Sequence, residues 1–324
     1  MRRLAAVTLI LLGAEFARAA AAPPRDGVRE VLDVRYHDTW STRHKLDVFA
    51  PADLKPGERR PVVIFAHGGT WVTGDKNFFG VYRGVGRALA KAGLVGVMVN
   101  YRLSPLVKHP EHVKDVARAF AWVREHVGKH GGDPDCIFLA GHSAGAHLVS
   151  LLATDDCYLK EPKLYLDKKD FQALRGVIAV SGVYRIPSPD EFKVMAKKTV
   201  DHLVGAPGSG RLTASLGPAL MVLSGPCNPF SLVFGKGCEV QKSASPLSHV
   251  RSGLPPFLMI NAEAEVPGLH DMAADFLKAL KEKGVPVEHH EVEGTNHRTI
   301  VKKLHRPDDE TTKLVLAFVK RNAG

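Results

Sequence analysis

Continuous apolar runs alternate with amphipathic segments over most of this chain, and that alternation limits the folds open to it. Residues 62–66 are apolar throughout, and residues 94–100 are apolar up to Asn100, as in strands that are buried on both faces of a sheet. Residues 79–92 between them carry apolar side chains at helical spacing. Further strands are expected at 137–140, 177–183, 256–261 and 287–292, and further helices after Pro110, after Ser143 and over 272–283 and 311–321. The pattern predicts an α/β fold with a mostly parallel sheet and helices on both faces.

The first nineteen residues have the layout of a secretory signal peptide. Arg2 and Arg3 precede an apolar run over 4–14, and small residues follow at 17–19. A run of this length is too short to span a bilayer core of about 30 Å, although a buried N-terminal helix is an alternative interpretation. We expect cleavage after Ala19, or alternatively after Ala22, and a secreted or periplasmic protein without a membrane anchor.

The basic charge of the chain points to no particular partner. Its 324 residues include 44 Lys and Arg and 34 Asp and Glu, a net charge of +10. Without residues 1–19 the balance is 41 to 33, or +8. The excess is scattered in pairs such as Lys168-Lys169, and no nucleic-acid-binding motif accompanies it. We therefore expect a solvated surface and no nucleic-acid partner.

One long segment interrupts the alternation of strands and helices. Residues 186–250 are rich in Pro, Gly and Ser and follow a predicted strand end, where α/β proteins place their binding loops. The segment is too long for a simple connection. We interpret it as a cap-like insertion within one domain that covers 20–324. Its apolar residues Phe230, Leu232 and Phe234 could line a substrate pocket or form a small satellite core.

Residues 141–145 read Gly-His-Ser-Ala-Gly, a G-x-S-x-G motif between a predicted buried strand and a predicted apolar helix. The glycines suit a sharp turn in which larger side chains would clash, and that turn exposes the Ser143 hydroxyl at the end of the sheet. Serine is a weak nucleophile at neutral pH and needs a base that is itself oriented by an acid. The motif therefore predicts a nucleophilic serine at position 143.

The base and the acid are expected late in the chain, after the last strands. His297 follows the strand that ends near residue 292, and we predict that it is the base. Glu265 and Glu263 both follow the strand at 256–261, and of the two we favour Glu265 as the acid. Asp271 is better placed as a cap or first-turn residue of the next helix.

His67-Gly68-Gly69 follows the first buried strand and predicts an oxyanion hole. Acyl transfer builds negative charge on the carbonyl oxygen, and backbone N–H groups can approach it closely where the residues are glycines. We predict that the N–H groups of Gly68, Gly69 and Ala144 are the donors, and that His67 has a structural role.

This order of motifs resembles that of the α/β-hydrolase superfamily. Within it, the chain is similar to small secreted carboxylesterases and feruloyl-esterase-like enzymes related to the hormone-sensitive-lipase group, from about residue 30 to 320. The similar stretches are His67 to Trp71, Asn100-Tyr101-Arg102, Asp115 to Trp122, Gly131 to His147, Ser245-Pro246-Leu247 and Asn296-His297. Kynurenine formamidases and prenylcysteine methylesterases share much of this pattern. The chain departs from it in having Glu265 where the family usually has Asp, and in its insertion at 186–250.

The resemblance implies an α/β-hydrolase fold and a serine hydrolase that cleaves small carboxylic esters through a covalent acyl-enzyme, without a cofactor. Amide or formamide hydrolysis at the same site is the first alternative. A catalytically inactive hydrolase fold that acts as a binding module is the second.

The four cysteines suggest two disulfides, as exported proteins often have. Cys227 and Cys238 would staple the insertion. Cys136 begins the strand before Ser143 and Cys157 follows the next helix, which could bring both to the same edge of the sheet. Two free buried thiols are the alternative for this second pair. The cysteines have no histidine partners at ligand spacing, so no metal site is expected.

Overall fold

The computed structural model describes residues 26–160, 164, 166, 168–195, 197, 229–235 and 237–324. The predicted signal peptide over 1–19 and the alternative cleavage point at Ala22 lie outside these described residues.

Eight strands form one sheet in the order β1-β2-β4-β3-β5-β6-β7-β8. The β1–β2 and β2–β4 pairs are antiparallel, and all other neighbouring pairs are parallel. The strands are β1 (Val28–Arg35), β2 (Lys45–Pro51), β3 (Arg60–Ala66), β4 (Val95–Val99), β5 (Gly132–His142), β6 (Leu174–Val180), β7 (Phe257–Ala264) and β8 (Val287–Asn296). This sheet confirms the predicted α/β-hydrolase fold class.

Helices connect the parallel strands. The α-helices are α1 (Val81–Lys91), α2 (Glu111–His126), α3 (Ala144–Thr154), α4 (Lys168–Gln172), α7 (Pro229–Phe234), α8 (Cys238–Ser243), α9 (Leu269–Glu282), α10 (Thr299–Lys303) and α11 (Glu310–Asn322). Short 3-10 helices cover η1 (Phe78–Gly80), η2 (Val127–His130), η3 (Asp156–Tyr158) and η5 (Pro246–His249). None of the helices in the described ranges is long and apolar enough to cross a membrane.

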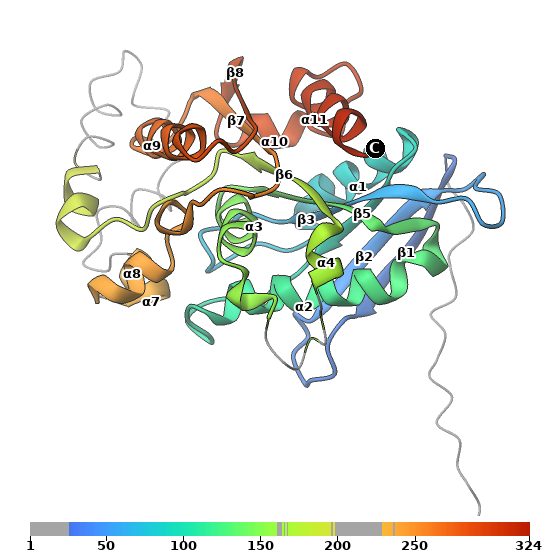
Figure 1. The fold of residues 1–324 in the computed structure, drawn as a ribbon, viewed down its shortest axis with the longest axis horizontal. Helices are drawn as coiled ribbons and strands as arrows, with labels where there is room; N and C mark the ends of the chain where they lie inside the picture. Colours follow the sequence, from blue (N-terminus) through green and yellow to red (C-terminus); the bar gives the residue numbers. More distant parts are fainter. Residues whose placement is uncertain are drawn as a thin grey trace, which may run out of the picture.

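The helices cover both faces of the sheet. One core contains apolar side chains of α1, α10 and α11, and the other contains those of α2, α3 and α9. In Figure 1, α2 and α11 accordingly lie on opposite sides of the strands. The parallel strands β3 to β7 are almost wholly buried, because helices shield them on both sides. This double burial is what the continuous apolar runs in the sequence predicted.

Several elements differ from the sequence-based expectation. The strands β1 and β2 were not predicted; β1 carries charged residues and is only partly buried, whereas β2 is almost wholly buried. Strand β6 ends at Val180 rather than 183, since Ser181 has a left-handed φ of 51°. Helix α9 begins at Leu269, which places Asp271 in its first turn as expected.

The described part of the insertion packs against the core on the α3 side. The rings of Phe230 and Phe234 lie 5.8 and 4.9 Å from that of Trp71. His147 of α3 donates from Nε2 to the carbonyl of Ala244 at 2.7 Å. Leu232 is 38% exposed. Phe230 and Phe234 therefore extend the main core rather than form a separate satellite core, and Leu232 does not join them.

The predicted Cys136–Cys157 disulfide is wrong, because both residues are free thiols. Cys136 belongs to the core on the α11 side, and its Sγ lies 3.6 Å from the carbonyl of Ala323. Cys157 follows α3, on the opposite face of the sheet, and is exposed. Both residues lie at the same edge of the sheet, but they are on opposite faces of it. Cys238 is also free, and its predicted partner Cys227 lies outside the described residues.

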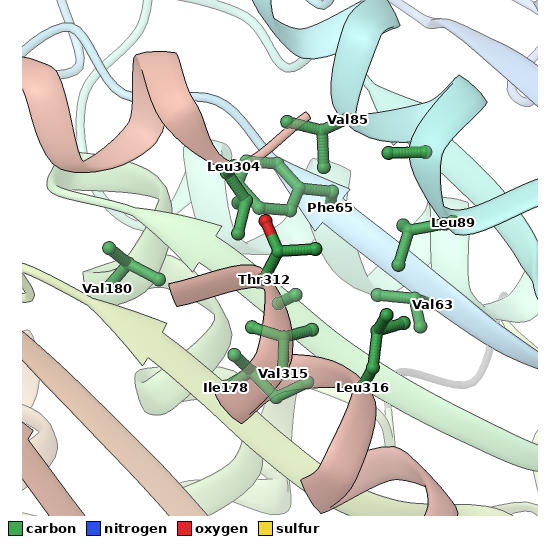
Figure 2. A pocket seen from close by; sticks show the side chains of 12 residues that line it. Val63, Phe65, Val85, Leu89, Ile178, Val180, Leu304, Thr312, Val315 and Leu316 are labelled. Atoms are coloured by element: carbon green, nitrogen blue, oxygen red, sulfur yellow. The ribbon is translucent and has the colours of Figure 1, made fainter. Parts of the chain in front are cut away.

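A small apolar cavity lies between the sheet and helices α1 and α11 (Figure 2). Its volume is about 10 Å³, at the lower limit for one water molecule and far below what a substrate needs. The hydroxyl of Thr312 is the polar group among the labelled apolar side chains. It is buried and has no hydrogen-bond partner among the residues that the structure describes. The cavity is a small packing defect, and the Thr312 hydroxyl beside it has no hydrogen-bond partner among the described residues.

Replacing this hydroxyl by a methyl group is expected to stabilise the fold. Thr312→Val should raise the free energy of unfolding by about 1 kcal/mol, because a buried polar group without a partner costs stability. Urea denaturation measures the change. Thr154→Val is the matched control, since the Thr154 hydroxyl is also buried in a helix but donates to Ser150 at 2.9 Å. The control should lose about 1 kcal/mol. Equal effects of the two variants would contradict the prediction.

Candidate active site

Ser143 stands at a sharp turn between β5 and α3. Its φ and ψ are 55° and −117°, a conformation that L-residues rarely adopt. A Cβ added at Gly145 would lie 2.1 Å from the carbonyl oxygen of Ala66 at the end of β3. A Cβ at Gly141 would lie 2.4 Å from the backbone of Gly145. The two glycines of the motif therefore permit the turn, for the steric reason predicted from the sequence.

His297 lies beside Ser143, although 154 residues separate them in the chain. It follows the end of β8, and the Asn296 side chain accepts the N–H groups of Arg298 and Thr299 at 3.0 Å each, which fixes the loop. The His297 Nε2 atom is 3.0 Å from Ser143 Oγ. Its Nδ1 atom is 2.7 Å from Glu265 Oε2.

The two candidate acids differ in what they bind. Glu265 has a fully buried side chain, accepts the Ala262 N–H at 3.0 Å and contacts His297. Glu263 is exposed and accepts the N–H of Gly294 at 2.8 Å. The structure thus brings Ser143, His297 and Glu265 into one hydrogen-bonded row and leaves Glu263 outside it.

Glu265 is ionised in its site. Burial acts to raise the pKa of its carboxyl, but the hydrogen bond and charge of His297 and the Ala262 N–H together outweigh burial and lower the pKa to about 2. A carboxylate held in this state accepts the His297 Nδ1–H, so the Nε2 lone pair of His297 points to the Ser143 hydroxyl.

The backbone after β3 lies next to the turn that carries Ser143. Gly68 was expected to offer its N–H to an oxyanion, but that N–H donates to the Tyr82 hydroxyl at 2.9 Å. The expectation for Gly68 is therefore wrong, since the donor is already engaged. His67 has the structural role expected of it: its Nδ1 donates to the Gly68 carbonyl at 2.7 Å, and its ring stacks on Tyr101 at 4.4 Å.

The N–H groups of Gly69 and Thr70, which follow Gly68 in this loop, are placed differently from that of Gly68. The Gly69 carbonyl accepts the N–H groups of Val72 and Thr73 at 3.1 and 2.9 Å, so it points into the turn. Because the peptide is planar and trans, the N–H of Thr70 points the opposite way. The N–H groups of Gly69, Thr70 and Ala144 have no acceptor within the described ranges. Ala144 is the first residue of α3, where the N–H is unpaired by geometry.

Tyr82 and His142 link the loop, the turn and the base. The Tyr82 hydroxyl accepts the Gly68 N–H and is 3.4 Å from His142 Nδ1. His142 Nε2 donates to the carbonyl of His297 at 2.8 Å. Burial lowers the pKa of His142 to about 3, so its ring is neutral and can accept at Nδ1 while it donates at Nε2. Sequence reasoning missed both residues, because a tyrosine in an amphipathic helix and the variable position of G-x-S-x-G give no distinctive signal.

A cavity of about 220 Å³ opens onto Ser143 and His297. Its wall combines the glycine loop, apolar side chains of η1 and α1, and residues in and just before α10 that include two basic side chains. The lining residues are Gly68, Gly69, Thr70, Thr73, Gly74, Phe78, Val81, Tyr82, His142, Ser143, His297, Arg298, Val301 and Lys302. Among the described residues there is no group of three or more His, Cys, Asp or Glu side chains that could hold a metal.

Comparison with protein families agrees with this architecture. The BD-FAE family model matches residues 46–268, which is more than half of the chain. The chain belongs to the BD-FAE family. The match covers the glycine loop, Ser143 and Glu265 of this BD-FAE member.

Curated relatives are named as esterases. The BD-FAE chain is 32% identical to the esterase LipQ of Mycobacterium tuberculosis over 280 residues, 85% of this chain and 58% of that one. It is 30% identical to the esterase LipC of the same organism over 249 residues, 73% of this chain and 52% of LipC. The chain thus spans little more than half the length of these relatives.

Solved structures share the fold. A truncated carbohydrate esterase from gut microbiota superposes with a TM-score of 0.67 and 19% identity, covering 95% of this chain and 98% of the other. An inhibited esterase B from Lactobacillus rhamnosis gives a TM-score of 0.67 and 21% identity, covering 94% and 88%. At this identity the likeness concerns the fold alone.

Removing the Tyr82 hydroxyl is expected to destabilise the protein. Tyr82→Phe leaves the buried Gly68 N–H without its acceptor, which should lower the free energy of unfolding by about 1–3 kcal/mol. Tyr184→Phe is the matched control, because the Tyr184 hydroxyl is buried without a partner among the described residues. That variant should be neutral or slightly more stable in the same urea titration. A neutral Tyr82→Phe would contradict the assignment of this hydrogen bond.

The ionised Glu265 is expected to make stability depend on pH. Its pKa is lowered on folding from 4.5 to about 2, so its contribution is present above about pH 4.5 and lost as pH falls toward 2. That contribution is at most about 3 kcal/mol. Urea denaturation of the wild type and Glu265→Gln should therefore give a difference that is largest at neutral pH and shrinks below pH 4.5. A difference that does not change with pH would refute the lowered pKa.

Proposed function

We propose that this protein is a carboxylic ester hydrolase whose catalytic residues are Ser143, His297 and Glu265. The observation that carries the proposal is the row of two hydrogen bonds, 3.0 Å from Ser143 Oγ to His297 and 2.7 Å from His297 to Glu265. A nucleophile, a base and an acid that orients the base are the parts that acyl transfer needs. The esterase names of LipQ and LipC support the ester as substrate.

The first half of the reaction forms an acyl-enzyme. Ser143 Oγ attacks the ester carbonyl carbon while His297 Nε2 takes the hydroxyl proton, and the carbonyl oxygen becomes an oxyanion. The N–H groups of Gly69, Thr70 and Ala144 are unpaired in the described structure, and we assign them as its donors. The carbon–oxygen bond to the alcohol then breaks, and His297 gives the proton to the departing alcohol. The acyl group remains on Ser143.

The second half restores the enzyme. His297 takes a proton from water, and the hydroxide attacks the acyl carbon. The bond to Ser143 Oγ breaks, His297 returns the proton to this oxygen, and the carboxylic acid leaves. Glu265 stays ionised throughout and stabilises the imidazolium that forms twice in the cycle.

Three variants test the assignment of roles. Ser143→Ala is expected to lower kcat for a short nitrophenyl ester by at least about 10³-fold, because the nucleophile is removed. Glu265→Gln should lower kcat by about 10²–10⁴-fold, because the neutral amide no longer orients and stabilises His297. Glu263→Gln is the matched control and should stay within about threefold of wild type, since the Glu263 carboxylate accepts the N–H of Gly294 in β8 and lies outside the hydrogen-bonded row.

A substrate panel tests the reaction type. Short and long nitrophenyl esters, feruloyl esters, acetylated sugars and N-formylkynurenine should be compared with wild type and Ser143→Ala. Hydrolysis of esters that is lost in Ser143→Ala is the expected result. Cleavage of N-formylkynurenine alone would replace the ester by a formamide substrate. Unchanged activity in Ser143→Ala would overturn the nucleophile, and a larger loss in Glu263→Gln than in Glu265→Gln would reverse the choice of acid.

A further inference from the structure

We propose that the cavity at Ser143 binds esters that carry a carboxylate group, and that Arg298 and Lys302 hold this group. The inference rests on the proposed ester hydrolysis and narrows its substrate class. It starts from the unequal distribution of charge around the cavity.

Both basic residues belong to one wall of the cavity. Arg298 directly follows His297 and caps the start of α10, and Lys302 lies four residues further along the chain. Both residues line the same cavity, so the guanidinium and the ammonium group lie on one side of α10 and the residue before it. Like charges at this spacing repel each other. An anion between or beside them would relieve that repulsion.

No acid of the cavity wall balances these two charges. The lining residues include neither Asp nor Glu, and neither basic side chain forms an ion pair within the described ranges. The carboxylates near the site are used elsewhere: Glu265 binds His297, and Glu263 binds the Gly294 N–H. By contrast, Arg102 is paired with both Asp115 and Glu111. The cavity therefore has a net positive wall that no acid in the described structure neutralises.

The other walls are suited to a short carbon chain. Phe78, Val81 and Val301 present apolar side chains. The hydroxyls of Thr70 and Thr73 both donate to the Gly69 carbonyl, at 2.8 and 3.2 Å, and so satisfy part of their bonding within the loop. The volume of about 220 Å³ is below the ~300–1,000 Å³ of pockets for drug-sized ligands.

A small ester that carries one free carboxylate, such as a half ester of a dicarboxylic acid, combines these features. Its carbon chain would contact the apolar side chains, and its free carboxylate would lie beside Arg298 and Lys302. The planar guanidinium and the compact ammonium group both bind carboxylates well. The carboxylate could belong to the acyl group or to the alcohol, and matched substrates separate the two arrangements.

The experiment measures kcat/KM for charged and neutral members of two ester pairs. Nitrophenyl hemisuccinate and nitrophenyl butyrate differ in a carboxylate on the acyl side, and 4-acetoxybenzoate and its methyl ester differ on the alcohol side. In one of the pairs the wild type should favour the charged ester by about tenfold, mainly through KM. The preference should shrink as NaCl rises, because salt screens exposed charges.

Variants assign the preference to the two residues. In Arg298→Gln/Lys302→Gln the ratio of charged to neutral kcat/KM should fall about tenfold. Lys303→Gln is the control: it removes one positive charge from α10, next to Lys302, at a position that does not line the cavity, so the ratio should not change.

Two results would overturn the anion subsite while leaving ester hydrolysis intact. These are hydrolysis of the neutral esters with no preference for a charged ester in either pair, and a preference that the double variant and Lys303→Gln reduce equally. If instead no ester of either pair is hydrolysed above the rate of Ser143→Ala, the proposed function itself fails and the subsite with it.

Discussion

The close approach of the β5–α3 turn to strand β3 is the constraint on which the site depends. Gly145 lies against the Ala66 carbonyl, where a Cβ would come within 2.1 Å. This contact allows Ser143 to keep a left-handed φ of 55° and places it next to the loop that begins at His67. A rigid sheet that is buried on both faces supplies the support for this strained residue. The nucleophile and the backbone donors therefore come from two adjacent strand ends.

A second set of contacts joins this pair of strand ends to the base. The ring of His297 forms hydrogen bonds with Ser143 and Glu265, and its backbone carbonyl accepts a hydrogen bond from His142. The neighbouring residues Ser143 and His142 thus hold the same histidine from two sides. Tyr82 connects this unit to the Gly68 N–H. All of these groups are at the same edge of the sheet, which is where α/β folds place their ligands.

The sequence predicted most of the fold and the central residues of the site, and each of its errors has a physical cause. Strands β3 to β7 were recognised because double burial leaves continuous apolar runs, whereas β1 at the edge carries charges and leaves none. The disulfide between Cys136 and Cys157 was wrong because a strand end can point to either face of the sheet. The role of Gly68 was wrong because the partner of its N–H, Tyr82, comes from a helix that the motif does not include.

The sequence by itself determined the layer architecture, the identity of the serine and histidine, and a choice between two glutamates, because these follow from local periodicity and from motifs at strand ends. The tertiary structure decided which glutamate reaches His297, which backbone N–H groups remain unpaired, and which charges line the cavity. Those features depend on distances between residues far apart in the chain. Arg298 and Lys302 are two ordinary basic residues in the sequence, and only the fold places them beside Ser143 without an acidic partner among the described residues.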